Sequence, residues 1–306
     1  MKINSGIGIL SGSKRLPIVF IHKGENRKHL PYVFAQAFSS NSGAEIYTIG
    51  DHATRLYSFI RHREVSDYFQ GAKDFAGVYQ HMSTNDFNFE RFCFQRWFIL
   101  LEFMQAENLE ACFILDSDVL LYSRIQSLFQ YYQQYKITVV NDWMASSIFI
   151  IERAGLEALC QFMLQMYTDP YWLEQAQRKY EIDLLNDQGG VCDMTAFQFF
   201  RLSHPGEIGE AGRIINNATF DFTLYDTQGY EMDGNLRRFY WKDGVPYCKH
   251  LESGQLIRFH TLHLQGPGKR LAGKFYTGSK PLLWLLKGER YLYRAYEKSA
   301  NVVRKL

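Results

Sequence analysis

The chain has 306 residues, of which 46% are hydrophobic and 22% are charged, a composition that fits a folded globular protein and excludes a disordered one. Its net charge of +2 is unevenly distributed: from Lys269 to the end there are ten Lys or Arg and two Glu, so the other 24 basic and 30 acidic side chains lie in residues 1–268. Because the basic residues concentrate in one short terminal segment, nucleic acid is a poor explanation for them.

The cysteines and the apolar segments bear on the compartment of the protein. The five cysteines are scattered and form no CxxC pair, so neither a disulfide framework nor a zinc site is indicated and a reducing compartment fits best. Residues 1–15 lack the continuous apolar core of a signal peptide, and no stretch approaches about 18 uninterrupted apolar residues. We therefore expect a cytoplasmic protein that touches a membrane at most from its inner face.

Strands and helices alternate in the first part of the chain. A buried strand at 16–24 precedes a helix at 30–40, and a second strand covers 44–51. After a less regular stretch to about residue 85, a helix at 88–108 leads into a buried strand at 111–115. Strands separated by helices are typical of an α/β fold with a mostly parallel central sheet and helices on both faces.

The rest of the chain continues with shorter elements and no clear linker. We expect, in chain order, a helix near 123–135, strands at 137–142 and 146–151, a helix near 154–167, a glycine-containing loop that runs into a helix over 186–200, and a hairpin at 237–248 that turns on Lys242-Asp243-Gly244. No repeat and no low-complexity tract interrupts this order. A single domain over residues 1–268, followed by a C-terminal extension at 269–306, is the economical organisation.

Polar residues follow three of the predicted strands, namely His22-Lys23-Gly24, Asp51 and Asp116-Ser117-Asp118. In a mostly parallel sheet these strand ends converge on one crevice, where ligands bind. Asp116 and Asp118 project to the same side across the small Ser117, and such oxygen pairs suit Mg²⁺ or Mn²⁺, which in turn suit phosphate. The alternative is an exposed turn with two solvated aspartates, although apolar residues bracket the motif on both sides.

An Asp-x-Asp motif between a buried strand and the apolar segment VLLY resembles the motif of the GT-A glycosyltransferases. The resemblance implies a GT-A fold in which Asp116 and Asp118 hold the metal that bridges the diphosphate of a sugar nucleotide. Farther along, His263, Gly266 and Lys269 form an H-x-x-G-x-x-K segment similar to that of retaining enzymes of glycosyltransferase family 8, which include lipopolysaccharide galactosyltransferases.

In that family the histidine completes the metal shell, and the glycine and lysine meet phosphates. Elementary chemistry agrees, since a neutral imidazole is a good Mn²⁺ ligand, a glycine lets backbone approach a phosphate and a lysine supplies a point charge. His260 competes with His263 for the metal, but odd separations in an extended segment face opposite sides, so only one of the two should reach it.

Arg96 is expected on the helix at 88–108, on one face with mostly apolar neighbours: Phe89, Phe92, Cys93, Leu100 and Phe103. A guanidinium there needs an anionic partner, so Arg96 either contacts the donor sugar or an aspartate of the site, as in similar sugar-nucleotide enzymes, or forms a structural salt bridge. The segment GGVCDMTAF resembles the region where these families place an acidic residue beside the transferred sugar, so Asp193 is the first choice and Asp187 the second. A favourable charge in the first turn of a helix is the alternative for Asp193.

The remaining nucleotide contacts are carried over from the resemblance by position only. They are His22, Lys23, Asp51 and Ser117, for which ordinary solvent exposure is the alternative. The first strand ends in His22-Lys23-Gly24 where family 8 usually has an aspartate, and Lys269 is followed by Arg270 without the expected tryptophan nearby. Membership of another GT-A family therefore stays open.

The resemblance implies a metal-dependent transfer of a sugar from a nucleoside diphosphate sugar, such as UDP-hexose, to an acceptor hydroxyl. The metal, Lys269 and Arg96 would stabilise the charge that grows on the leaving diphosphate. If the anomeric configuration inverts, Asp193 would be a general base, and if it is retained, as the C-terminal segment favours, Asp193 would orient the sugar. The rivals are a sugar-nucleotide pyrophosphorylase and a non-catalytic nucleotide- or glycan-binding protein on the same scaffold.

The C-terminal segment from Lys280 onward mixes aromatic and aliphatic residues with Lys and Arg. That composition fits docking on an anionic cytoplasmic leaflet, where a lipid-linked acceptor would be found. The alternative is a terminal helix that packs on the domain and leaves its lysines solvated.

Overall fold

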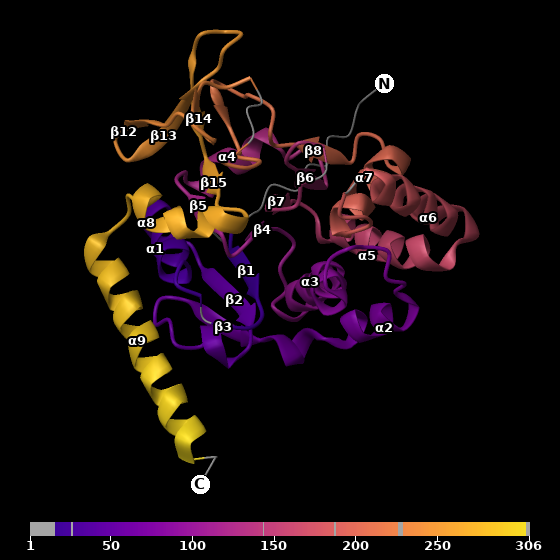
Figure 1. Ribbon diagram of the computed structural model, residues 1–306, viewed down its shortest axis with the longest axis horizontal. Helices are drawn as coiled ribbons and strands as arrows, with labels where there is room; N and C mark the ends of the chain where they lie inside the picture. The colour runs from indigo at the N-terminus through magenta and orange to yellow at the C-terminus, as the bar shows by residue number, and fades with distance from the viewer. Residues whose placement is uncertain (1–15, 26, 143, 187, 226–228, 304–306) are drawn as a thin grey trace, which may run out of the picture.

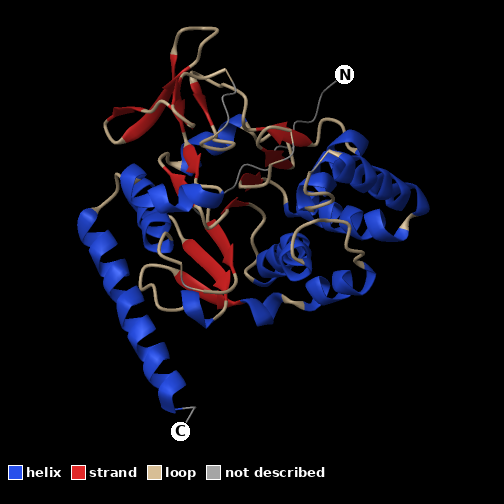
Figure 2. Ribbon diagram, viewed as in Figure 1, coloured by secondary structure: helices blue, strands red, loops and turns tan. Residues whose placement is uncertain are grey.

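The computed structural model describes residues 16–303 except for 26, 143, 187 and 226–228 (Figure 1). Its centre is a seven-stranded sheet with the strand order β3-β2-β1-β4-β7-β6-β8. The strands of this sheet are β1 (Ile18–His22), β2 (Ile46–Gly50), β3 (Arg61–Glu64), β4 (Cys112–Leu115), β6 (Ile137–Val139), β7 (Ser147–Ile150) and β8 (Ile208–Glu210). Helices surround the strands, as the colouring in Figure 2 shows.

Most neighbouring strands of the sheet run parallel. β1 pairs with β2 and with β4, β2 pairs with β3, and β6 pairs with β8 in parallel, whereas β7 runs antiparallel to both of its neighbours, β4 and β6. The predicted α/β fold, a mostly parallel sheet flanked by helices, is therefore confirmed. The carboxyl ends of β1, β2 and β4 open toward the same edge, where the polar strand ends predicted from the sequence lie together.

Side chains that alternate along the strands build two hydrophobic cores, one on each face of the sheet. On β1, Ile18 and Phe20 pack on the face covered by α1 (Leu30–Ser40), and Val19 packs on the face covered by α3 (Phe87–Ala106). The α1 face also carries α8 (Ala272–Phe275) and α9 (Lys280–Val303), and the α3 face carries α2 (Gln70–Val78), α5 (Arg153–Thr168), α6 (Pro170–Leu185) and α7 (Asp193–Ser203) (Figure 1).

Outside the central sheet, β5 (Val119–Leu121) pairs antiparallel with β15 (Thr261–His263), and His263 lies opposite Val119. The other short strands lie beyond this pair, at the top of Figure 1: β9 (Ala218–Thr219), β10 (Met232–Asp233), β11 (Leu236–Arg237), β12 (Tyr240–Lys242), β13 (Val245–Lys249) and β14 (Leu256–Phe259). The predicted hairpin at 237–248 is confirmed as β12 and β13, joined by Asp243 and Gly244, which both have positive φ.

The helix predicted at 123–135 is wrong in its extent. Only α4 (Ile125–Leu128) is α-helical, and a 3₁₀ turn at Phe129–Tyr131 follows it. The cause is packing: the rings of Phe129 and Tyr132 turn inward against Phe149, with centroid distances of 6.1 and 5.2 Å, and aromatic residues are poor helix formers. Tertiary contacts thus replace continued helix in this segment.

Some elements have no counterpart in the sequence predictions. The stretch before residue 85, expected to be irregular, contains β3 and α2, and α6 was not expected at all. A signal for α6 is nevertheless present, because the Asp169 carboxylate caps the helix by accepting the backbone N–H groups of Tyr171 and Trp172, and Pro170 occupies the first turn. Within the described residues, no helix is both long and apolar enough to cross a membrane.

Gly50, the last residue of β2, lies where the backbone of the neighbouring strand is very close. A Cβ atom at this position would lie 2.4 Å from the carbonyl oxygen of His22 and 2.6 Å from Oγ1 of Thr54. We expect Gly50→Ala to lower the free energy of unfolding by about 1–3 kcal/mol, the usual cost of overpacking, in urea denaturation followed by circular dichroism.

Gly77→Ala in α2 is the matched control, because nothing lies within 4 Å of its added Cβ. This change should leave the protein as stable as before or stabilise it by up to about 1 kcal/mol, since alanine is the better helix former. Equal stability of Gly50→Ala and the unmodified chain would show that the strand ends can separate freely, contrary to the tight arrangement described above.

Candidate functional site

A cleft of about 2090 Å³ lies at the carboxyl ends of β1, β2 and β4. Every residue predicted for the site lines it: His22, Lys23, Asp51, Arg96, Asp116, Ser117, Asp118, Asp193, His263, Gly266 and Lys269. Single-ligand pockets usually measure roughly 300–1,000 Å³, so this cleft is larger than one such pocket. Asp187, the second choice for the acidic residue, lies outside the described residues.

Two carboxylates and one imidazole meet in the middle of the cleft. Asp116, Asp118 and His263 each offer a ligand atom within 4.8 Å of the others, and Nε2 of His263 lies 3.5 Å from Oδ1 of Asp118. The turn between β4 and β5 supplies both aspartates, and β15 supplies the histidine through its pairing with β5. The alternative of an exposed turn with solvated aspartates is wrong for Asp118, whose side chain is only 13% exposed.

The donor chemistry of this cluster fits a divalent cation. Mn²⁺ binds readily to a set of two carboxylate oxygens and one imidazole nitrogen, and Mg²⁺ would bind chiefly to the carboxylate oxygens of this set. The orientation of His263 also fits: its Nδ1 lies 2.8 Å from the carbonyl oxygen of Phe222, which can only accept, so Nδ1 carries the hydrogen and Nε2 faces the aspartates.

A buried ion pair between Asp221 and Arg237 holds β15, the strand that carries His263, in place. The backbone N–H of His263 donates to Oδ2 of Asp221 at 2.7 Å, and Oδ1 of Asp221 accepts from Arg237 at 2.6 Å. Both side chains of this pair are fully buried. Removing either partner would leave an uncompensated charge in the interior, so the position of His263 is tied to the integrity of the core.

Charges in the cluster shift the protonation of its members. Burial alone would lower the pKa of His263, but the hydrogen bond and the charge of Asp118 raise it to about 9. Burial raises the pKa of Asp118, but its contacts with His263 and Lys269 outweigh burial and lower that pKa. The site therefore attracts positive charge, either as protons and a lysine or as a metal ion.

Lys269 and Gly266 approach the cluster from the 3₁₀ turn Gly266–Leu271. Nζ of Lys269 lies 3.1 Å from Oδ2 of Asp118, and its side chain is 44% exposed, so it can also turn toward a ligand in the cleft. Gly266 has a φ of +57°, and a Cβ atom added there would meet nothing within 4 Å, so the left-handed backbone alone favours glycine at this position.

Arg96 lies between the Asp116–Asp118–His263 cluster and Asp193, and it contacts an aspartate on each side. Its Nη1 contacts Oδ1 of Asp116, and its Nη2 and Nε donate to Oδ2 of Asp193 at 2.7 and 3.2 Å. The indole N–H of Trp97 donates to the same Asp193 oxygen at 3.0 Å. The anionic partners expected for Arg96 are thus two aspartates, one from the β4–β5 turn and one from the first turn of α7.

Asp193 is nearly buried, with 5% of its side chain exposed, yet it lines the cleft. Its Oδ2 accepts three hydrogen bonds, whereas Oδ1 accepts none from the residues that the structure describes. Phe89, Phe92 and Cys93 line the cleft together with Arg96, as their common helix face predicts, and Phe89 is 61% exposed.

The ends of β1 and β2 are tied to each other and to the Asp-Ser-Asp turn. Nδ1 of His22 lies 3.0 Å from Oγ of Ser117, and its Nε2 lies 3.0 Å from the carbonyl oxygen of Glu25, so Nε2 donates and Nδ1 accepts. Burial lowers the pKa of His22. The Asp51 carboxylate accepts the backbone N–H groups of Gly24 at 2.8 Å and Ala53 at 3.1 Å, so it shapes the floor of this end of the cleft.

Lys23 stands over the rings of Phe92 and Phe69, with centroid distances of 5.4 and 5.8 Å. The sequence predictions missed several basic residues of the cleft wall, among them Arg290 and Arg294 of α9. Between them in the chain, Tyr293 packs on His52, the residue after Asp51, at a ring distance of 6.0 Å. The excess of Lys and Arg in the C-terminal segment was the sequence feature that indicated such residues. Composition alone, however, does not say which of these side chains face the cleft and which face the outer surface.

Comparisons with known proteins concern the fold. No family model and no curated protein sequence matches the chain. Among solved structures, mouse xyloside xylosyltransferase 1 in its apo form is similar over 66% of this chain and 87% of its own, with 13% identity and a TM-score of 0.47. The galactosyltransferase LgtC in complex with donor and acceptor sugar analogs is similar over 90% of this chain and 100% of its own, with 13% identity and a TM-score of 0.49.

The bifunctional glycosyltransferase WbbM is similar over 87% of this chain and 49% of its own, with 9% identity and a TM-score of 0.48. These solved structures are glycosyltransferases. At such identities the similarity concerns the path of the backbone, and the chemistry of this chain has to follow from its own side chains.

His260, the other candidate histidine, lies outside the cluster. Its Nδ1 is 2.8 Å from Oγ of Ser123 and its ring packs on Phe220. Burial, followed by the charge of Arg258, lowers the pKa of His260 from 6.5 to about 3. His260 is therefore a neutral residue of the interior.

This burial predicts a pH dependence of stability. Below pH 6.5 the unfolded chain binds a proton at His260, whereas the folded chain does not bind it until the pH falls to about 3. The neutral, buried His260 therefore contributes its full share to the free energy of unfolding above pH 6.5, and this share is lost as the pH falls. At about 1.4 kcal/mol per pH unit, His260 should account for about 2 kcal/mol of the fall in unfolding free energy between pH 7 and pH 5. We expect His260→Asn to flatten the urea-derived stability profile by that amount, and parallel profiles would contradict the assignment.

Proposed function

We propose that this protein is a metal-dependent glycosyltransferase of the GT-A type, which moves a sugar from a nucleoside diphosphate sugar to an acceptor hydroxyl. The observation that carries the proposal is the meeting of Asp116, Asp118 and His263 beside Lys269 in a cleft at the carboxyl ends of parallel strands. A diphosphate needs a cation to balance its charge, and this group of residues would hold one. The H-x-x-G-x-x-K segment favours glycosyltransferase family 8, a UDP-hexose donor and retention of configuration.

Asp116, Asp118 and His263 would hold Mn²⁺ or Mg²⁺. When bound, the ion stabilises the negative charge that develops on the leaving diphosphate. Lys269 now contacts Asp118 but is 44% exposed, so it is positioned to exchange this partner for a phosphate oxygen. Gly266 lies on the same turn, where its bare backbone permits close approach of the phosphates.

In the reaction, the bond from the anomeric carbon to the diphosphate oxygen breaks, a bond to the acceptor oxygen forms, and the acceptor hydroxyl gives up its proton. Asp193 is the residue we assign to the sugar side of the cleft. Arg96 and Trp97 hold its Oδ2, and Oδ1 remains for a hydroxyl of the donor sugar or the acceptor. With inversion Asp193 would take the acceptor proton, and with retention it would orient the sugar while the departing diphosphate oxygen takes the proton.

The nucleoside would occupy the end of the cleft formed by His22, Lys23 and Asp51, with Ser117 near the diphosphate. Residues 1–268 would then form the catalytic domain, and the segment from Lys269 onward would complete the site. Such an enzyme would act in the cytoplasm on a glycan or lipid-linked acceptor.

The donor can be identified by thermal shift. Nucleoside diphosphate sugars are added with and without Mn²⁺, and a ligand that binds only the folded protein raises its melting temperature. A rise that requires both components, followed by metal-dependent hydrolysis of the same sugar nucleotide, supports the proposal. Binding without hydrolysis or transfer would favour the non-catalytic rival, and exchange of pyrophosphate into the donor would favour a pyrophosphorylase.

Asp118→Asn should abolish the joint effect of Mn²⁺ and the donor. The amide keeps the size of the side chain but removes the charge that holds the ion, so we expect metal affinity and transfer rate to fall by about 100-fold or more. Titration calorimetry with Mn²⁺ and a radiolabelled-sugar transfer assay measure the two quantities. Asp243→Asn, in the exposed β12–β13 turn, is the matched control and should change neither.

Asp193→Asn should separate binding from chemistry. Because Asp193 lies on the far side of Arg96 from the metal ligands, the Kd for the Mn²⁺ complex of the nucleoside diphosphate should stay within about threefold, while kcat falls by about 100-fold. Single-turnover kinetics with the labelled donor would check the split. A variant that transfers sugar at the unmodified rate would remove Asp193 from the reaction.

A further inference from the structure

Helix α9 (Lys280–Val303) has two different sides. Toward the protein, Leu282, Leu283 and Leu286 are buried, Nζ of Lys287 donates to the hydroxyl of Tyr32 at 2.7 Å, and Glu289 accepts the backbone N–H of Ser58 at 3.3 Å. Figure 1 shows the helix running along the edge of the molecule and extending past its body. The contacts fix α9 to the domain and leave its other side uncovered by the described residues.

The uncovered side is apolar and aromatic. Its exposed side chains are Trp284 at 69%, Leu285 at 45%, Tyr291 at 74%, Leu292 at 68% and Tyr296 at 72%. At 100° per residue, Trp284, Leu292 and Tyr296 fall within one third of the helix circumference, and Leu285 and Tyr291 complete the same stripe. We call these five residues the outer stripe. Large apolar side chains are rarely left together in water without a partner.

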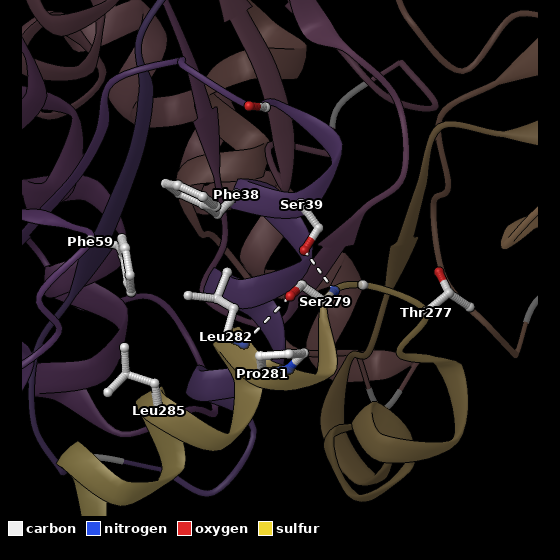
Figure 3. A pocket seen from close by; sticks show the side chains of 10 residues that line it. Phe38, Ser39, Phe59, Thr277, Ser279, Pro281, Leu282 and Leu285 are labelled. Atoms are coloured by element: carbon white, nitrogen blue, oxygen red, sulfur yellow. Dashed lines mark hydrogen bonds between the residues drawn. The ribbon is translucent and has the colours of Figure 1, made fainter.

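A shallow apolar cavity of about 650 Å³ continues the outer stripe at the start of α9. Figure 3 shows Phe38, Phe59, Leu282 and Leu285 around this cavity, with Pro281 at its margin. Leu285 belongs to both the cavity and the stripe, so the apolar surface runs from the α1 end onto the helix. Phe59 is itself 44% exposed.

The charges of α9 identify the partner of this surface. Lys280, Lys287, Arg294 and Lys298 are exposed on the helix, and Glu289 turns inward to Ser58. An apolar stripe flanked by cations is the pattern of a helix that lies in the interface of an anionic membrane, with tryptophan and tyrosine at the headgroups. A two-fold pairing with a second copy would instead bring these cations together.

We propose that the outer stripe and the adjoining cavity dock this protein on an anionic lipid bilayer, with α9 lying in the plane of the membrane. The helix does not cross the bilayer, since no helix among the described residues is long and apolar enough to do so. Its 24 residues extend about 36 Å along the surface. Because Arg290 and Arg294 of the same helix line the cleft, the membrane would lie beside the cleft opening. If the proposed transferase function holds, the acceptor is therefore linked to a lipid.

Sedimentation with sucrose-loaded vesicles tests the docking with the full chain. Phosphatidylglycerol vesicles should bind the protein at least ten times better than phosphatidylcholine vesicles in 0.1 M salt, and 0.5 M salt should weaken that binding. Trp284→Ala combined with Leu292→Ala should reduce binding to anionic vesicles by at least tenfold. Leu185→Ala, which truncates a leucine that is 86% exposed at the end of α6, is the control and should bind as the unmodified chain does.

Several outcomes would overturn the proposal. They are equal binding to neutral and anionic vesicles, full binding by the double variant, and a dimer in analytical ultracentrifugation that the double variant abolishes while no vesicles bind. Donor hydrolysis in the absence of vesicles keeps this test separate from the proposed function, because Trp284 and Leu292 lie outside the cleft. The double variant should hydrolyse the donor normally and melt at the same temperature, so lost binding cannot come from misfolding.

Discussion

The candidate site depends on the pairing of β5 with β15. This short antiparallel ladder places His263 opposite Val119, one residue after Asp118, although the two strands lie far apart in the sequence. It also brings Lys269 within 3.1 Å of Asp118. Without the pairing, the two aspartates would form an acidic turn with neither the histidine nor the lysine beside it. The fully buried Asp221–Arg237 pair strengthens the arrangement, since Asp221 holds the backbone of His263.

Charge balance explains how three carboxylates can gather at this edge of the sheet. Asp116 and Asp193 share Arg96, and Asp118 faces Lys269 and His263, whose pKa is raised to about 9 against the effect of burial. The cluster is thus close to neutral by itself. A divalent cation would release the proton of His263 and free Lys269 for another anion, so binding of metal and binding of diphosphate are expected to support each other. Arg96 connects this half of the cleft to Asp193.

Local patterns in the sequence predicted the elements that carry the site. The alternation of strand and helix from residue 16 to 51, the long helix with Arg96 and the strand before Asp116 all follow from hydrophobic periodicity. The meeting of Asp116, Asp118 and His263 came from the family resemblance, because no periodic pattern relates segments so distant in the chain. Packing decided what the sequence could not. The inward turn of Phe129 and Tyr132 shortened a predicted helix.

The C-terminal helix shows the same limit more clearly. The composition shows an excess of basic and aromatic residues in this segment. Which of them face the cleft and which face away depends on how α9 is rotated about its own axis. Arg290 and Arg294 line the cleft, whereas Trp284 and Tyr296 face away from the domain. The buried leucines at the start of α9 fix that rotation, since turning the helix would expose Leu282, Leu283 and Leu286 to water. The hydrophobic contact of one turn therefore determines which cations can reach a ligand in the cleft and which remain at the outer surface.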